Sequence, residues 1–272
     1  MPVISSSLVL QSEGDTRKNP IIGYEQLVTI ANVAADSEDP NNPVTNLANP
    51  ATNLIWASLS TDVQYVTVDI SRTDPVDYVG IAEHNFGTAR IIVSVEGYAE
   101  LDEEGAPIWF ELTAGALATD QPALFRFTPQ SLIGLRLKLT PLAVAPTLAV
   151  LYVGKLLVLP RPIYGGHTPI NLGKQTRVSS NRSESGKFLG RVVLQQSAAS
   201  GAQLTQLPPG WVREHLEPFL SFAEENCFFF AWRSQEYPTE VGYVWLTNDP
   251  KPVNSQPNGF MEVELSFGGI VS

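Results

Sequence analysis

Alternating apolar and polar positions mark most of the first 158 residues. Residues 135–139 read Leu-Arg-Leu-Lys-Leu, and this strict alternation gives one buried and one solvated face, as in a β-strand. Runs rich in β-branched and aromatic residues occur at residues 63–70, 76–81, 90–96, 124–128, 134–139 and 148–153. Turn-forming residues separate these runs at intervals of roughly ten residues, so the pattern predicts a β-sandwich over residues 31–158.

The pattern changes after residues 156–166, where two prolines and a Gly-Gly pair interrupt it. Residues 171–181 and 186–196 then read as two extended arms. Residues 209–226 carry one apolar stripe at helical spacing, and Pro218 is expected to divide that helix. Strands are predicted at residues 227–233, 241–247 and 260–267. This order predicts a smaller α+β domain with one main helix.

The first 30 residues contain short extended pieces that need a sheet to join. We therefore assign residues 1–30, together with residues 159–272, to one domain, and treat the sandwich of residues 31–158 as an insertion. The expected fold class is mainly β, a jelly-roll sandwich plus a smaller α+β domain.

Composition narrows the function. The 272 residues include 21 prolines, 20 glycines and only 17% charged side chains, which excludes a helical bundle. The net charge is −11, and residues 1–158 hold 18 acidic and 8 basic side chains against 10 and 9 in the remainder. A general binder of phosphate backbones needs a positive field, so we expect no specific nucleic-acid binding.

Membrane and secretion signals are missing from the sequence. No apolar run reaches the roughly 18–20 residues of a membrane span, and residues 1–11 lack the features of a signal peptide. Cys227 is the only cysteine, which excludes an intrachain disulfide and a cysteine-rich metal site. We expect a protein made in the cytoplasm without a membrane span.

Catalytic motifs are also missing. The three histidines, His84, His167 and His215, have no metal-ligand spacing, and no nucleophile elbow or phosphate-binding loop occurs. The acidic runs at residues 36–39 and 102–104 could form a cation loop or a carboxylate pair, but solvated turns explain them better. Cys227 opens an apolar strand and is interpreted as a small buried hydrophobe. We predict no enzyme, no cofactor and no metal.

Two features are not explained by core packing. Residues 174–191 carry five basic side chains against Glu184, a net of +4: Lys174, Arg177, Arg182, Lys187 and Arg191. This segment is either a solvated hairpin or an arm that contacts the acidic surface of a neighbouring subunit. The second feature is the strand at residues 227–233, which is apolar on both faces and needs two covers. We predict that Phe228, Phe230 and Trp232 lie at a subunit interface.

The segments Asn-Leu-Ala-Asn-Pro…Trp at residues 46–56, Val-Thr-Val-Asp-Ile at residues 66–70 and residues 76–85 resemble the discoidin-type, galactose-binding-like jelly roll. In that family an Ala-Asn-Leu…Trp segment precedes an Ile-Thr-Val-Asp-Leu strand. The resemblance covers about residues 31–155 and implies that fold. It leaves open a carbohydrate-binding module that contacts host surface glycan through Trp109, Tyr98 and Asn85. Trp56 is more consistent with a core position.

The C-terminal part is similar to tail proteins of long-tailed bacteriophages, namely the distal-tail or baseplate components that close the tail tube. The segments that carry this resemblance are residues 164–170, 188–191, 218–219 and 228–233. The resemblance implies a structural virion protein at the tail tip, with copies of itself in a hexameric ring. It also implies contacts with the tail tube, the baseplate hub and the tape measure. This phage-tail function is our main hypothesis, and glycan binding is the alternative.

Overall fold

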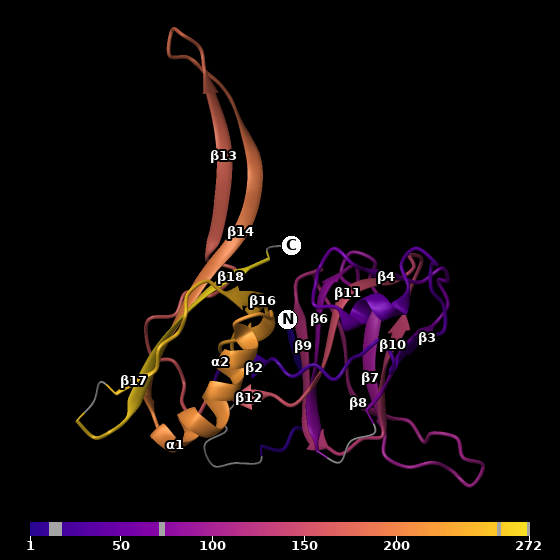
Figure 1. Ribbon diagram of the computed structural model, residues 1–272. Helices are drawn as coiled ribbons and strands as arrows, with labels where there is room; N and C mark the ends of the chain where they lie inside the picture. The colour runs from indigo at the N-terminus through magenta and orange to yellow at the C-terminus, as the bar shows by residue number, and fades with distance from the viewer. Residues whose placement is uncertain (11–17, 71–73, 255–256, 271–272) are drawn as a thin grey trace.

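Three β-sheets make up most of the protein, as Figure 1 shows. The computed structural model describes residues 1–10, 18–70, 74–254 and 257–270. Two of the sheets face one another, and the third sheet carries the helical segment and a long protruding hairpin. The predicted mainly-β fold, a sandwich plus a smaller α+β unit, is confirmed.

The sandwich consists of two five-stranded sheets with a shared apolar core. Trp56, Phe125 and Leu137 are fully buried between the sheets, because alternation along each strand points every second side chain inward. The first sheet, in spatial order, is β1 (Pro2–Ile4), β9 (Ala123–Gln130), β6 (Val76–His84), β11 (Thr147–Gly154) and β4 (Trp56–Ala57). The second is β3 (Val33–Ala35), β5 (Gln64–Asp69), β10 (Gly134–Thr140), β7 (Ile92–Tyr98) and β8 (Phe110–Ala116). A short 3-10 helix, η1 (Val44–Ala48), precedes β4.

The third sheet collects strands from both ends of the chain. In spatial order it is β12 (Leu157–Val158), β2 (Ile21–Gly23), β15 (Phe228–Ala231), β16 (Val241–Leu246), β18 (Met261–Gly269), β14 (Phe188–Leu207) and β13 (Lys174–Arg182), with β17 (Val253–Asn254) paired to β18. Strand β2 pairs with β12 through Ile22 and Leu157. The chain therefore leaves this sheet at β2 and returns beside it at β12, with the sandwich in between.

The helical segment covers one face of the third sheet. It runs through α1 (Pro209–Trp211), a π-helical turn, η2 (Val212–Leu216), and α2 (Glu217–Ala223). Pro218 has no N–H and would clash with the carbonyl four residues earlier, so the turn before it widens, and the Glu217 N–H bonds to the Val212 carbonyl. The proline widens the helix at this point but does not break it into two separate helices.

Strand β15 is buried on both faces within this one chain. Phe228 and Phe230 pack toward the helical segment, where Phe228 meets Phe219 with ring centroids 4.9 Å apart. Phe229 and Ala231 face the sandwich and join Tyr152 and other residues of its first sheet in a shared cluster. The prediction that Phe228 and Phe230 lie at a subunit interface is therefore wrong, because the helical segment covers them and the sandwich covers the opposite face of the strand.

Close packing joins the sandwich to the third sheet. A Cβ on Gly80 would lie 2.6 Å from the Phe229 ring, and one on Gly23 would lie 2.6 Å from the Tyr78 ring. The Tyr243 hydroxyl donates to the Pro50 carbonyl at 2.8 Å, and the Tyr152 hydroxyl donates to the Cys227 carbonyl at 3.0 Å. These contacts cross the junction from both sides and fix the two parts against each other.

The first 30 residues do not all lie in one domain. Strand β2 lies in the third sheet, where Ile22 pairs with Phe230. Strand β1 instead runs parallel to β9 at the edge of the sandwich, with Val3 paired to Phe125. The assignment of residues 1–30 to the second domain is therefore corrected for β1, which contributes to the sandwich.

Candidate functional site

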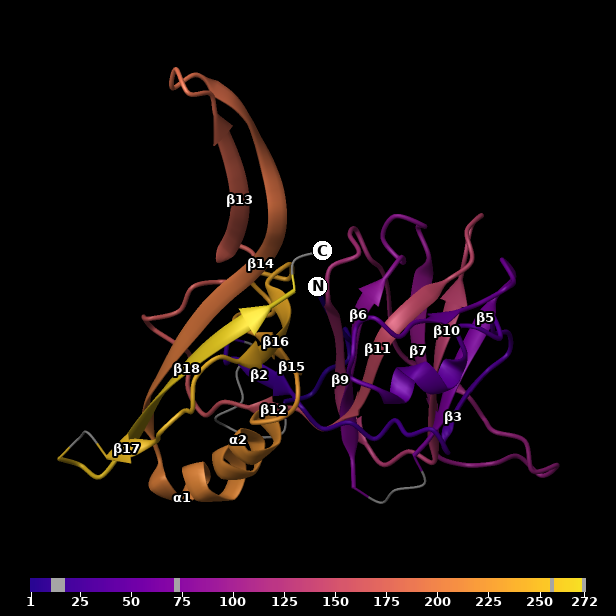
Figure 2. The same ribbon diagram turned by 45° about the horizontal axis from the view of Figure 1, so that its top comes forward.

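A long β-hairpin projects from the third sheet into solvent (Figures 1 and 2). Strand β14 is 20 residues long, and its second half pairs with β18 from Ala198 onward. Its first half pairs only with β13. We call residues 174–197 the arm. Nine paired residues at about 3.3 Å each give it a reach of about 30 Å.

The root of the arm is fixed to the sheet. The Thr168 N–H donates to the Gly201 carbonyl at 3.2 Å, and a ring nitrogen of His167 lies 2.9 Å from the same oxygen. Gly173 has no room for a side chain, because a Cβ there would lie 1.8 Å from the Ala199 carbonyl oxygen. Burial lowers the pKa of His167, so its ring stays neutral in this contact near neutral pH.

Turn chemistry closes the far end of the arm. The Gly186 N–H donates to the Ser183 carbonyl at 2.8 Å, and the Ser183 hydroxyl accepts the Lys187 N–H at 3.0 Å. Gly186 has a φ of +82°, in the left-handed region that glycine adopts without a steric cost. The tip is therefore ordered by its own hydrogen bonds.

The surface of the arm combines positive charge with exposed apolar side chains. Phe188, Leu189 and Leu194 are 65%, 66% and 60% exposed, and Val192 and Val193 are exposed as well. All five basic residues singled out from the sequence lie on this ribbon and are exposed: Lys174, Arg177, Arg182, Lys187 and Arg191. None of them forms an ion pair with another residue of the described ranges.

Neither face of the arm is covered by its own chain. A two-stranded ribbon is marginally stable in water when nothing packs on it, and contiguous exposed apolar surface marks an interaction site. The arm therefore has the charge, apolar area and accessibility of a surface that binds another macromolecule. Of the residues predicted at an interface, the five basic ones lie on the arm.

The aromatic residues that we predicted at the interface lie elsewhere. Phe228 is fully buried and Phe230 is 4% exposed. Trp232 is half-buried at the root of the arm, where its ring stacks on Tyr237 with centroids 5.6 Å apart and lies 4.9 Å from the His167 ring. Phe228 and Phe230 therefore lie in the core of the third sheet and are not available for a partner, whereas Trp232 is only partly covered.

The three candidate ligand contacts of the sandwich fall into two groups. Tyr98 and Trp109 meet edge to face, with centroids 4.7 Å apart. The Arg136 guanidinium lies 4.1 Å from the Trp109 centroid and 4.2 Å from that of Tyr65, and it bonds to Glu96 at 2.7 Å. Asn85 comes directly after β6, at the end of the sandwich away from Tyr98 and Trp109. Its side-chain amide donates to the Ala145 carbonyl and accepts the Thr147 N–H. The structure therefore does not bring Asn85 to the aromatic pair.

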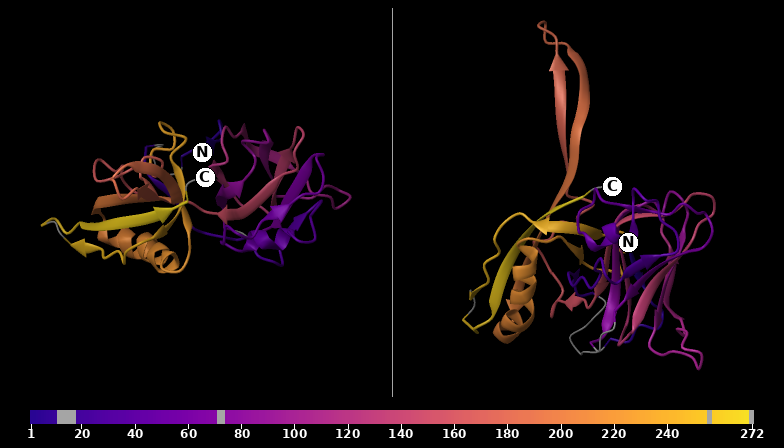
Figure 3. Two further views of the ribbon diagram at one scale, coloured as in Figure 1. Left: turned by 90° about the horizontal axis from the view of Figure 1, so that it is seen from above. Right: turned by 45° about the vertical axis from the view of Figure 1, so that its right-hand side comes forward.

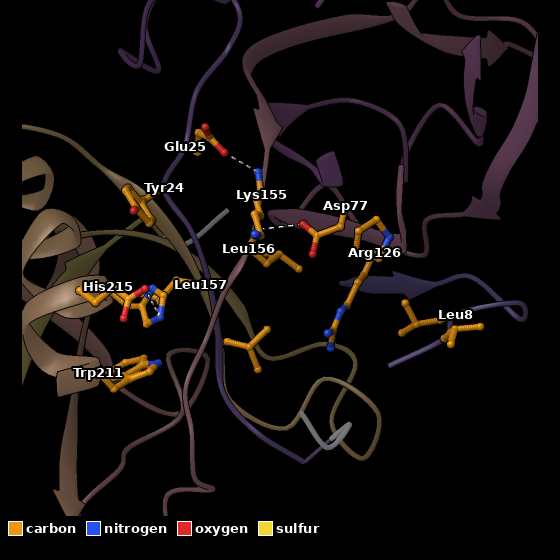
Figure 4. A pocket seen from close by; sticks show the side chains of 14 residues that line it. Leu8, Tyr24, Glu25, Asp77, Arg126, Lys155, Leu156, Leu157, Trp211 and His215 are labelled. Carbon is orange, nitrogen blue, oxygen red and sulfur yellow. Dashed lines mark hydrogen bonds and ion pairs between the residues drawn. The ribbon is translucent and has the colours of Figure 1, made fainter. Parts of the chain in front are cut away.

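A cleft of about 540 Å³ lies between the sandwich and the helical segment (Figure 4). Trp211 and His215 line one side and Arg126 the other. Two of its carboxylates accept hydrogen bonds from the connection between β11 and β12: Glu25 accepts the Lys155 N–H, and Asp77 accepts the Leu156 N–H, each at 2.7 Å. The Glu25 and Asp77 carboxylates therefore hold the backbone that connects the sandwich to the third sheet.

Buried titratable groups have structural partners. His84 lies 3.1 Å from the Gln121 carbonyl and accepts the Phe86 N–H at 3.2 Å, and burial lowers its pKa to about 4. Burial raises the pKa of the Cys227 thiol, which keeps it protonated and poorly nucleophilic. No group of three His, Cys, Asp or Glu side chains in the described ranges is placed to hold a metal ion. No described helix is both long and apolar enough to cross a membrane.

The acidic run at residues 102–104, interpreted from the sequence as a solvated turn at a hairpin tip, lies on a protruding element. Residues 99–110 form a second protruding hairpin, extending from the end of the sandwich (Figure 1). Leu101 bridges Pro107, and the Asp102 carboxylate accepts the N–H groups of Glu104 and Ala106 at 2.9 and 2.8 Å. The run of acids at residues 102–104 predicts a turn, but nothing in the sequence shows that this hairpin protrudes from the sandwich.

Among known proteins, only solved structures are similar to this chain. No family model matches the sequence, and no curated protein matches it. Chitosan-binding module 1 of a chitosanase/glucanase from Paenibacillus sp. IK-5 is similar, with 16% identity, a TM-score of 0.40, and coverage of 47% of this chain and 98% of the module. The module CpGH89CBM32-5 from Clostridium perfringens, in complex with GalNAc-β-1,3-galactose, has 12% identity, a TM-score of 0.38, and coverage of 45% and 93%. The CBM32 of AlyQ, in complex with 4,5-unsaturated mannuronic acid, has 18% identity, a TM-score of 0.38, and coverage of 48% and 96%.

Proposed function

We propose that this protein is a structural subunit that assembles with copies of itself through the arm. The observation that carries the proposal is an ordered ribbon with exposed cations and exposed apolar residues on which nothing in its own chain packs. A contact that buries such a ribbon gains hydrophobic stabilisation, and complementary charge selects the partner surface.

The more specific form of this proposal is a ring at the distal end of a phage tail that joins the tail tube to the baseplate or receptor-binding apparatus. It is supported by the resemblance of residues 164–170, 188–191, 218–219 and 228–233 to such tail proteins. In this form the third sheet belongs to the ring, and the sandwich extends from it. The expected location is the tail tip of the virion.

Removing the arm tests the proposal. Gln175 and Ser197 are direct cross-strand partners, so replacing residues 176–196 with Asn-Gly closes the ribbon by a two-residue hairpin turn. Light scattering with size-exclusion chromatography should show oligomers for the full chain and a monomer for the shortened chain. A full chain that stays monomeric at high concentration would contradict self-assembly. Labelling in an electron micrograph of assembled particles then tests the tail-tip location.

Glycan binding by the sandwich is a second candidate. It is supported by the discoidin-type resemblance of residues 46–85 and by the Tyr98–Trp109 pair at one end of the sandwich, where Trp109 is half-buried. The three solved structures above are sugar-binding modules, and none of them is a tail protein.

A glycan array tests the second candidate directly. Wild-type protein should bind selected glycans, and Trp109→Ala should abolish that binding if the aromatic pair forms the site. Trp245→Ala serves as the matched control, because this tryptophan is 40% exposed on β16 in the other part of the chain. An array on which the wild-type protein binds nothing would eliminate glycan binding.

A further inference from the structure

The hairpin at residues 99–110, which we call the acidic finger, matches the arm in charge. Four of its residues are acidic and none is basic: Glu100, Asp102, Glu103 and Glu104. The arm has five basic residues and one acidic residue. The finger therefore carries −4 where the arm carries +4. All four carboxylates are exposed, and none forms an ion pair with a residue that the structure describes.

The two hairpins also match in their apolar surface. Leu101, Ile108 and Phe110 of the finger are 51%, 45% and 37% exposed. The finger keeps its shape through its own bonds, since Asp102 N–H donates to the Ala106 carbonyl at 2.8 Å and Ile108 N–H to the Glu100 carbonyl at 3.2 Å. Both elements are thus ordered before any contact, which reduces the entropy lost on binding.

One chain cannot join its own arm to its own finger. The arm rises from the third sheet, and the finger extends from the far end of the sandwich in the opposite direction, as the views in Figures 1 and 3 agree. The junction between the sandwich and the third sheet is closely packed, so it does not bend to bring the two together. A contact between them requires two copies.

We propose that the arm of one copy docks on the acidic finger of the next copy. This inference rests on the proposed self-assembly and names the surface that receives the arm. The contact is head-to-tail, since two different patches meet. An open assembly therefore leaves a free arm at one end and a free finger at the other, and a closed ring leaves neither. Arginine and lysine side chains meet the finger carboxylates, while Phe188, Leu189 and Leu194 pack against Leu101, Ile108 and Phe110.

In this contact the apolar residues contribute most of the affinity, and the charges determine which surface is bound and how fast. Exposed ion pairs each contribute at most about 1 kcal/mol, so the affinity comes mainly from apolar burial. The charges select the partner and accelerate association, and they are screened over about 8 Å at physiological salt. Self-association should therefore weaken as the salt concentration rises.

Charge reversal on both sides tests the pairing. The finger variant is Glu103→Lys with Glu104→Lys, which leaves the structural Asp102 intact. The arm variant is Arg182→Glu with Arg191→Glu. Sedimentation velocity should show that each variant self-associates at least about tenfold more weakly than wild type. Each double change cancels the net charge of its hairpin and places two like charges against the partner hairpin. An equimolar mixture of the two variants should form dimers, because the unchanged arm of the finger variant meets the unchanged finger of the arm variant. The chain with all four changes should assemble more strongly than either double variant, because the exchanged side chains again face opposite charges.

The matched control is Glu224→Lys with Glu225→Lys, an adjacent exposed pair at the end of α2 that changes the net charge equally. It should assemble as wild type does. Circular dichroism and thermal melting check that every variant is folded.

The outcomes separate the inference from the proposed function. If the finger variant assembles normally while the arm variant does not, the arm docks on another surface and the inference fails, but self-assembly stands. The inference fails in the same way if assembly is not restored in the chain with all four changes. A wild-type chain that is monomeric under all conditions contradicts self-assembly itself, and a tail component other than this chain would then be the occupant of the arm.

Discussion

Two glycines at the junction allow an aromatic ring of the opposite part to pack directly against their backbone. Gly80 of β6 lies against the Phe229 ring, and Gly23 of β2 lies against the Tyr78 ring. In each pair, a glycine from one part of the molecule receives an aromatic ring from the other. The backbones can approach closely because no Cβ stands between them. The absence of a side chain at these two positions therefore sets the distance between the sandwich and the third sheet.

Adding one methyl group at this junction should be costly. Gly80→Ala places a Cβ 2.6 Å from a fully buried ring, so Phe229 must shift within a packed core. We expect the free energy of unfolding to fall by about 1–3 kcal/mol in urea denaturation. Gly165→Ala is the control, because a Cβ there meets nothing within 4 Å. Equal stability of the two variants would contradict the steric argument.

His84 should make stability depend on pH. Burial lowers its folded pKa to about 4, below the unfolded value of about 6.5. Between these values the unfolded chain binds the proton and the folded chain does not, so stability is complete above pH 6.5 and falls as the pH drops. We expect His84 to account for a loss of about 2 kcal/mol between pH 7 and 4.5.

The comparison with His84→Gln isolates that contribution. Urea denaturation at pH 7 and 4.5 gives the loss of unfolding free energy for each protein. The variant should lose about 2 kcal/mol less than the wild type over this range, since glutamine does not titrate. Identical losses would show that His84 is not the group responsible.

Among the elements, the arm and strand β15 differ most in what surrounds them. Every residue of β15 is buried, and its two faces belong to two different cores. The outer part of the arm contacts only its own partner strand. The first element contributes to stability and the second is available for binding.

Shortening the arm should therefore leave stability almost unchanged. Replacing residues 176–196 with Asn-Gly removes no residue of any core cluster. We expect the free energy of unfolding of the monomer to change by less than about 1 kcal/mol, measured by urea denaturation at a concentration where the full chain is dissociated. A larger loss would mean that the arm packs on its own chain in solution.

Sequence patterns predict elements better than they predict what covers them. The strict alternation at residues 135–139 locates β10 to within about one residue, and the stripe around Leu216 and Phe219 locates the helical segment. The double apolar character of β15 predicts two covers but not their source, because any apolar surface satisfies the pattern. The same limit applies to the arm: its charge predicts either a solvated hairpin or a contact, and only the fold shows that the arm and the finger both protrude.

At the scale of the whole molecule, the two parts share a core. Tyr78, Leu124 and Tyr152 of the sandwich are fully buried against residues of the third sheet. The face of the sandwich that looks toward the third sheet is therefore as apolar as an interior. The sequence boundaries alone make residues 31–158 look like an independent module, and this face argues against that.

The excised sandwich should be a poor soluble domain. A chain of residues 31–158 lacks β1 and exposes the Tyr78, Leu124 and Tyr152 face. We expect it to bind the apolar dye ANS and to self-associate, while the full chain under dissociating conditions binds little dye. A version that starts at residue 1 and ends at residue 158 controls for the loss of β1. A monomeric, dye-free fragment would show that the shared core is dispensable.

The pairing of β2 with β12 has a consequence for how such a chain can change over evolutionary time. The two strands are antiparallel neighbours, with Ile22 opposite Leu157, so their Cα atoms lie about 5 Å apart. More than a hundred residues thus occupy the place of a hairpin loop. Any unit whose ends lie side by side fits the same gap without altering the order of the third sheet. A replacement for the sandwich would have to reproduce the apolar face that meets Phe229 and to provide a strand partner for β1, which pairs with β9.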